Sequence, residues 1–170
     1  MVGREVVFTL EKPEGVPGPV VLEVQGACAE NDRGLPALQD LSLQVRAGEI
    51  VGIAGVAGNG QSELAQAITG LRRCAKGHVL INGEDIINRP PRQAIERHIA
   101  HVPEDRTGVG SAPSLSLAEN LIMKSYRAAP VSTGWVLNRP VIRSQAEESK
   151  EAYDIAAPNI DVQARLLSGG

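Results

Sequence analysis

A glycine-rich segment constrains this chain more than any other part of its sequence. Residues 55–62 read Gly-Val-Ala-Gly-Asn-Gly-Gln-Ser, which matches the phosphate-binding loop pattern G-x-x-x-x-G-K-[ST] except at the lysine, where Gln61 stands. The run before it, Glu49 to Ala54, is apolar and typical of a buried strand, and the run after it, Glu63 to Gly70, has a helical pattern closed by glycine. The succession of strand, glycine-rich segment and helix predicts a P-loop. The missing lysine leaves open whether the loop runs chemistry, only holds a nucleotide, or does neither.

Composition narrows the classes of protein to consider. The 170 residues suit one domain with a real core, and 42% hydrophobic with 22% charged residues is ordinary for a soluble globular protein. A net charge of −3 gives no general electrostatic drive toward nucleic acid or anionic lipid, and only 2% aromatic residues argue against base-stacking surfaces. Cys28 and Cys74 lack CxxC spacing and indicate reduced thiols. No apolar run approaches the roughly 18 residues of a membrane span, and no secretion leader is visible.

The other elements are predicted from alternation, turn residues and helix caps. Residues 1–19 are rich in proline and glycine and are expected to be a linker. Trp135 and Tyr126 are expected to pack inside the C-terminal helical part. Helices are expected at 90–97, after a capping box at Ser116 to Glu119, and as a charged helix at 143–156. Strands are expected at 20–24, 41–45, 79–81, 84–87 and 99–102, with a turn at 30–34 and a type I′ turn at Asn82-Gly83.

Four features in order carry a family resemblance. They are Leu41-Ser-Leu-Gln-Val-Arg-Ala-Gly-Glu49, the P-loop, Val102-Pro-Glu-Asp-Arg106, and the terminal Leu167-Ser168-Gly169-Gly170, which matches the start of an LSGGQ signature. Together they resemble the ATP-binding subunit of ABC transporters. The resemblance implies an α/β fold: a P-loop NTPase core with an antiparallel β subdomain and a partial helical subdomain. The domain would span residues 20–170, with the helical subdomain at about 107–166, and would lack the Walker B part.

A narrower resemblance concerns the loop and the Val102 to Arg106 segment. Both look like the second, degenerate nucleotide-binding half of duplicated bacterial importers for nucleosides and simple sugars. Met1-Val-Gly-Arg-Glu5 is similar to the segment that joins their two halves. The chain would then be a fragment of a subunit about three times its length.

The resemblance implies a nucleotide site at the loop, with ATP and Mg²⁺ as cofactors. Backbone amides at a helix N-terminus can hold phosphate whatever the side chains are, and the hydroxyl of Ser62 is the candidate Mg²⁺ ligand. Gln61 carries no charge, which predicts roughly tenfold weaker nucleotide binding and a larger loss of phosphoryl transfer. The alternative is a glycine turn kept only for packing. The predicted nucleotide-binding residues are Gly55, Val56, Ala57, Gly58, Asn59, Gly60, Gln61, Ser62 and Glu63.

Two further sites follow from the resemblance. Glu104 stands where the family has its Q-loop glutamine, so it is expected in the coupling loop that faces the membrane subunits. The alternative is a solvated loop in which Glu104 pairs with Arg106. The signature residues Leu167, Ser168, Gly169 and Gly170 are expected to act in trans, on ATP held by an opposite half. The weakened loop and the intact signature together predict a division of labour between two halves.

The expected function is the ATP-binding component of an ABC importer for nucleosides or simple sugars, in which ATP binding and hydrolysis by the intact subunit drive transport. The expected partners are a second ABC nucleotide-binding half and transmembrane permease subunits, at the cytoplasmic face of a bacterial plasma membrane. The chain alone is expected not to hydrolyse ATP, and no catalytic residue is assigned. The alternatives are a non-hydrolysing nucleotide- or partner-binding module and, disfavoured by the missing lysine and the signature, another P-loop protein such as a small kinase. An exposed apolar edge and marginal stability are also expected.

Overall fold

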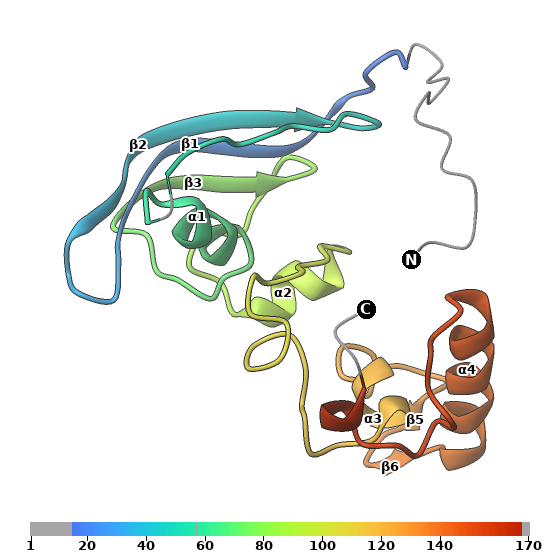
Figure 1. The fold of residues 1–170 in the computed structure, drawn as a ribbon. Helices are drawn as coiled ribbons and strands as arrows, with labels where there is room; N and C mark the ends of the chain where they lie inside the picture. Colours follow the sequence, from blue (N-terminus) through green and yellow to red (C-terminus); the bar gives the residue numbers. More distant parts are fainter. Residues whose placement is uncertain (1–14, 57, 168–170) are drawn as a thin grey trace. The chain divides into compact units, whose positions relative to one another are not determined.

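The chain folds into two compact units. The computed structural model describes residues 15–56 and 58–167, and the units divide between Ile99 and Ala100. Figure 1 follows the chain through both of them. Each unit is treated by itself below.

The first unit is built on a four-stranded antiparallel sheet in the order β2-β1-β3-β4. Strands β1 (Val20–Glu30) and β2 (Pro36–Arg46) form a long hairpin, and β3 (Lys76–Ile81) pairs with the other edge of β1 before turning into β4 (Glu84–Asp85). The turn between β3 and β4 has positive φ at both central residues, 49° at Asn82 and 83° at Gly83. A type I′ turn requires this, and Asn-Gly adopts it readily. The predicted antiparallel strands and this hairpin are confirmed.

Helix α1 (Gln61–Ile68) covers one face of the sheet (Figure 1). Its Leu64 and Ala67 are buried in a core cluster with residues of β1, β2 and β3, among them Val24 and Val79. The helix ends as predicted, because Gly70 has φ 73°, in the left-handed region that closes many helices. Helix α2 (Pro91–Glu96) starts with proline in its first turn and adds Ala94 to the same core.

Two predicted strands are wrong. Neither Glu49–Ala54 nor Ile99–Val102 is a strand, although both are apolar. A strand needs hydrogen-bonded neighbours for its backbone, and within the described part of the chain the four sheet strands pair only with one another. The consequence is exposure: Ile50 is 87% exposed, and Val51 and Ile53 are exposed beside it. Exposed apolar side chains are therefore present at residues 50–53, but the strand whose edge was expected to be exposed is not formed.

The second unit is mainly helical. Its elements are α3 (Leu117–Leu121), a small hairpin of β5 (Ser132–Thr133) and β6 (Val136–Leu137), α4 (Arg139–Ala152) and a 3₁₀ turn, η1 (Ala164–Leu166). Its core consists of Ala118, Ile122, Val131, Ile142, Ala146 and Ile160. The antiparallel β subdomain, the helix after the loop and this helical part agree with the expected α/β P-loop NTPase-like fold in partial form. The bounds expected for the linker and the helical subdomain stay predictions.

The caps of α3 and α4 explain where these helices start. The predicted capping box is present: the Ser116 hydroxyl accepts from the Glu119 amide at 3.2 Å, and the Glu119 carboxylate accepts from the Ser116 amide at 2.8 Å. Helix α4 begins four residues before the predicted Arg143 and ends at Ala152 rather than Ala156. The Asn138 side chain caps it, and the proline that follows suits a first helical turn.

The expected packing of Trp135 and Tyr126 inside this unit is wrong. Trp135 lies between β5 and β6, directly after Gly134 with φ 66°, and its relative exposure is 103%. Tyr126 is 44% exposed. The core of the second unit is filled by aliphatic and small side chains, so neither aromatic ring takes part in it.

Candidate functional site

The glycine loop leads directly into α1, and Gly60 is the residue that joins them. Gly60 is the N-cap of α1 and has φ 96°, which favours glycine. A Cβ at this position would lie 2.5 Å from the carbonyl oxygen of Ala37 in β2. The structure therefore requires glycine here for packing, whatever the loop binds.

The start of α1 offers backbone donors to an anion. The first N–H groups of a helix have no partner within the helix, and the helix dipole adds a partial positive charge at this end. Gln61, Ser62 and Glu63 form this first turn. An anion placed there would be held by main-chain N–H groups and by the Ser62 hydroxyl.

Gln61 folds back onto the loop instead of extending away from it. Its Nε2 donates to the carbonyl oxygen of Val56 at 3.3 Å, and the backbone N–H of Asn59 donates to the same oxygen at 3.2 Å. The Gln61 amide also packs against Gly55, where a Cβ would contact it. The side chain thus ties the two ends of the loop together. It brings no positive charge, and the sequence of residues 55–62 contains no cation.

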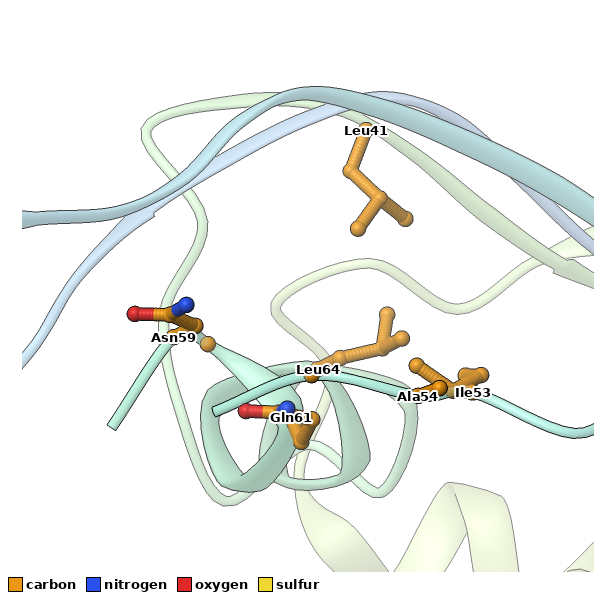
Figure 2. Close-up of a pocket in the computed structure, with 8 residues that line it drawn as sticks. Leu41, Ile53, Ala54, Asn59, Gln61 and Leu64 are labelled. Carbon is orange, nitrogen blue, oxygen red and sulfur yellow. The ribbon is translucent and has the colours of Figure 1, made fainter. Parts of the chain in front are cut away.

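A pocket of about 270 Å³ opens beside the loop. Figure 2 shows Leu41 of β2 facing Leu64 of α1 across it, with Ile53 and Ala54 on the same side as Leu64. The loop itself supplies the polar part of the wall, from Asn59 and Gln61. The complete lining is Leu41, Ile53, Ala54, Gly55, Asn59, Gly60, Gln61 and Leu64. An apolar wall beside backbone donors suits a ligand with a flat apolar part and an anionic part.

Sequence reasoning did not identify Leu41, Ile53, Ala54 and Leu64 as parts of this site. Leu41 and Leu64 come from segments more than twenty positions apart, so the motif alone does not bring them together. The alternation in β2 and the helical spacing in α1 were the available signals, and they indicate which side chains point inward. They do not indicate that a space remains between the two elements.

The residues fit a phosphate-bound Mg²⁺ only in part. Ser62 provides a hydroxyl, and Mg²⁺ in nucleotide sites takes most of its other ligands from phosphate oxygens and water. Among residues 15–56 and 58–167, no group of three or more histidine, cysteine, aspartate or glutamate side chains is placed to hold a metal by itself. A magnesium ion would therefore depend on the nucleotide that it accompanies.

The other predicted site residues are Ala57 of the loop, and Glu104 and Leu167 to Gly170 in the second unit. Glu104 is exposed in the second unit. Leu167 is described, and its amide donates to the Ala164 carbonyl oxygen at 3.1 Å. Ala57, Ser168, Gly169 and Gly170 lie outside the described residues. The roles assigned to all of these residues stay predictions.

In the part of the chain that the structure describes, no helix has the length and apolar character needed to cross a membrane.

Comparison with known proteins identifies the family. The sequence model of the ABC transporter family matches residues 38–170. The guanosine import ATP-binding protein NupO of Bacillus subtilis is 44% identical over 170 residues, which is 100% of this chain and 33% of NupO. The nucleoside import ATP-binding protein NupA of Lactococcus lactis is 42% identical over 100% of this chain and 34% of its own length. The chain thus spans about a third of these relatives.

Solved structures agree on the fold. A dimeric ATP-binding cassette in a post-hydrolysis state with ADP and Pi aligns with a TM-score of 0.68 at 20% identity, over 87% of this chain and 63% of that one. A nucleotide-free ATP-binding cassette from an ABC transporter aligns with a TM-score of 0.66 over 88% of this chain and 60% of that one. Because the sequence identity to such structures is this low, they support the fold alone and not a function. The sequence and fold comparisons together show that this chain is an ATP-binding domain of the ABC transporter family, homologous to nucleoside and sugar import ATP-binding proteins.

Proposed function

We propose that this chain is the degenerate second nucleotide-binding half of an importer for nucleosides or simple sugars. The observation that carries the proposal is the glycine loop at the start of α1, whose backbone donors remain in place although Gln61 replaces the lysine. The likeness to guanosine, nucleoside and ribose import proteins over the whole chain supports the type of importer. In the intact subunit, ATP binding and hydrolysis would drive uptake.

ATP binding at this loop would rest on neutral donors. The N–H groups at the start of α1 and the Ser62 hydroxyl would hold the phosphates, and the Gln61 amide would leave the Val56 carbonyl to donate to them. Mg²⁺, when bound, would neutralise phosphate charge. Neutral hydrogen bonds contribute roughly 1 kcal/mol against about 1.5–3 for charged ones, so the site would bind weakly.

The partners follow from the same proposal. A second nucleotide-binding half would hold ATP against the signature residues Ser168 to Gly170 of this chain, and permease subunits would contact the loop around Glu104. The assembly would lie at the cytoplasmic face of a plasma membrane. Weak binding at residues 55–62 would then place most turnover in the opposite site.

Titration of the chain with Mg-ATP tests the loop, and Gly58 is the position to change. Its φ is 88° and no atom lies within 4 Å of a Cβ built there, so a substitution does not disturb the sheet as one at Gly60 would. Asparagine and aspartate tolerate positive φ alike. We expect Gly58→Asp to bind Mg-ATP at least about tenfold more weakly than Gly58→Asn, because only the aspartate repels phosphate. Equal affinities would remove the loop from the proposal.

A non-hydrolysing nucleotide- or partner-binding module is the second candidate. The neutral Gln61 side chain tied to Val56 favours it, because phosphoryl transfer needs stabilised charge on the γ-phosphate. Phosphate release from ATP distinguishes the two when this chain is joined to an opposite half with a lysine-bearing loop. Turnover by the joined halves supports the importer ATPase. ATP turnover by this chain alone would contradict the division of labour between two halves.

A further inference from the structure

The second unit presents an unusual exposed segment between α3 and α4. Residues 121–139 run through turns, the β5–β6 hairpin and the start of α4. Exposed apolar side chains along it are Leu121, Met123, Tyr126, Trp135, Val136 and Leu137. Trp135, at the tip of the hairpin, is the most exposed of them and is the sole tryptophan of the sequence. We call residues 121–139 the hairpin surface.

The hairpin surface is anchored, so its exposed side chains are not the result of a loose loop. Ile122 and Val131 of this segment are buried in the core of the second unit. The Ser132 amide donates to the Ala128 carbonyl oxygen at 3.0 Å, and the Asn138 amide donates to the Val131 carbonyl oxygen at 2.8 Å. The backbone therefore holds Trp135 outward on a fixed hairpin.

Charge is the second property of this surface. Residues 121–139 contain Lys124, Arg127 and Arg139 and no acidic residue, in a chain with a net charge of −3. Hydrogen bonds from Ser116, and in smaller part the charge of Arg139, hold the pKa of the Glu119 carboxyl below its ordinary value, so part of the Arg139 charge is offset. The Arg127 guanidinium lies 5.3 Å from the centre of the Tyr126 ring. Among the described residues Lys124 makes no ion pair. Arg127 thus places positive charge beside the exposed Tyr126 ring, and Lys124 adds a second cation to the same segment.

We infer that the hairpin surface contacts anionic lipid headgroups at a membrane surface. Tryptophan and tyrosine favour the boundary between water and hydrocarbon, and lysine or arginine near them is attracted by anionic lipids. Trp135 is fully exposed at the tip of the β5–β6 hairpin, so its ring is free to enter between headgroups. The inference rests on the proposed function, which brings the chain beside a membrane. It adds a direct lipid contact that neither the loop nor the signature requires.

The single tryptophan makes the inference directly measurable with the full chain. Vesicles of phosphatidylcholine and of phosphatidylcholine with phosphatidylglycerol are added, while Trp135 emission and co-sedimentation are followed. We expect a blue shift and binding with the anionic vesicles only, both weakened by salt. Lys124→Gln should lower the partition coefficient about fivefold, as expected for one cation near an anionic surface. Trp135→Ala should lower it about tenfold, because burying even roughly 60 Å² of apolar surface has that effect.

Two matched controls separate this contact from general stickiness. Arg73→Gln removes an exposed cation from the first unit, and Ile50→Ser removes an exposed apolar side chain there. Neither should change binding to anionic vesicles. Equal losses in these controls and in the hairpin variants would overturn the inference. An unshifted Trp135 emission with anionic vesicles would also overturn the inference. A shift that occurs only when solubilised permease is added without lipid would overturn it too, and would assign the surface to a protein partner. Mg-ATP affinity is measured in parallel, because loss of nucleotide binding with intact vesicle binding would fault the proposed function alone.

Discussion

Gly60 at the start of α1 lies against Ala37 of β2, so closely that a Cβ on Gly60 would be 2.5 Å from the Ala37 carbonyl oxygen. The same glycine is the second fixed glycine of the phosphate-binding pattern of residues 55–62. The motif position and the packing of helix on sheet therefore depend on one residue. A loss of nucleotide binding after substitution of Gly60 would not by itself reveal a nucleotide site.

Replacing Gly60 should destabilise the fold in the absence of any nucleotide. We expect Gly60→Ala to lower the free energy of unfolding by more than about 2 kcal/mol, from the left-handed φ together with the contact to Ala37. Gly58→Ala is the matched control, since Gly58 also has positive φ and nothing lies within 4 Å of its Cβ position. Gly58→Ala should lower the free energy of unfolding only by the backbone strain, roughly 1 kcal/mol. Urea unfolding measures both, and equal losses would contradict the packing role of Gly60.

Restoring the lysine should strengthen nucleotide binding. Gln61→Lys exchanges a neutral donor for a charged one, so we expect Mg-ATP to bind about tenfold more tightly. Gln145→Lys on α4 adds the same charge in the other unit and should have little effect. Calorimetric titration of the three proteins gives the comparison. An unchanged affinity in Gln61→Lys would mean that phosphate does not approach this position.

Asp85 should make the first unit sensitive to acid. Burial alone would raise the pKa of the Asp85 carboxyl, but hydrogen bonds from the His78 ring at 2.6 Å and from the Ile87 and Val79 amides outweigh it and hold the pKa below its ordinary value. A carboxyl with a lowered folded pKa contributes stability above its ordinary value of about 4, and this contribution is lost as the pH falls through the lowered pKa. We expect Asp85→Asn to be destabilised by roughly 1 kcal/mol at pH 6.

The difference between Asp85→Asn and the parent chain should begin to shrink as the pH falls below about 4, because the carboxyl of the unfolded chain then binds protons more readily than the folded one, whose pKa is lower. Chemical unfolding across this range measures it. Asp154→Asn is the control, since among the described residues the Asp154 side chain makes no hydrogen bond. A difference for Asp85→Asn that stays constant from pH 6 to pH 3 would rule out the proposed link between this carboxyl and stability.

The exposed apolar residues 50–53 should drive self-association. Ile50, Val51 and Ile53 are exposed side by side, and unpaired backbone of this kind can pair with another copy. We expect Ile50→Ser to weaken association about fivefold or more, as for removal of roughly 40 Å² of apolar contact. Val16→Ser changes an exposed valine ahead of β1 and should leave association unchanged. Sedimentation velocity at several concentrations measures the association of the parent chain and of both variants. A chain that stays monomeric throughout would refute this role.

Local signals in the sequence predicted the local structure well. Asn82-Gly83 fixes its turn through backbone preference, Gly70 ends α1 for the same reason, and Ser116 with Glu119 forms its capping box from four consecutive residues. The glycine loop was predicted because a motif is local too. Features that depend on distant partners were not predictable in this way.

The wrong predictions share one physical cause. The apolar run at 49–54 contains no information on whether a neighbouring strand is present to pair with it. An aromatic residue such as Trp135 is most often buried, but its burial depends on which other side chains fill the core. The pocket between Leu41 and Leu64 arises from the fit of a helix on a sheet, which no periodicity specifies.

The exposure of Trp135 also determines how folding of this protein can be observed. A tryptophan that is already surrounded by water in the native state meets nearly the same surroundings in the unfolded chain. Its emission should therefore change little during unfolding, although the whole core is lost. A flat fluorescence trace in denaturant would not indicate an unfolded or molten protein. Far-ultraviolet circular dichroism, which reports α1 and α4 directly, is the appropriate probe of its stability.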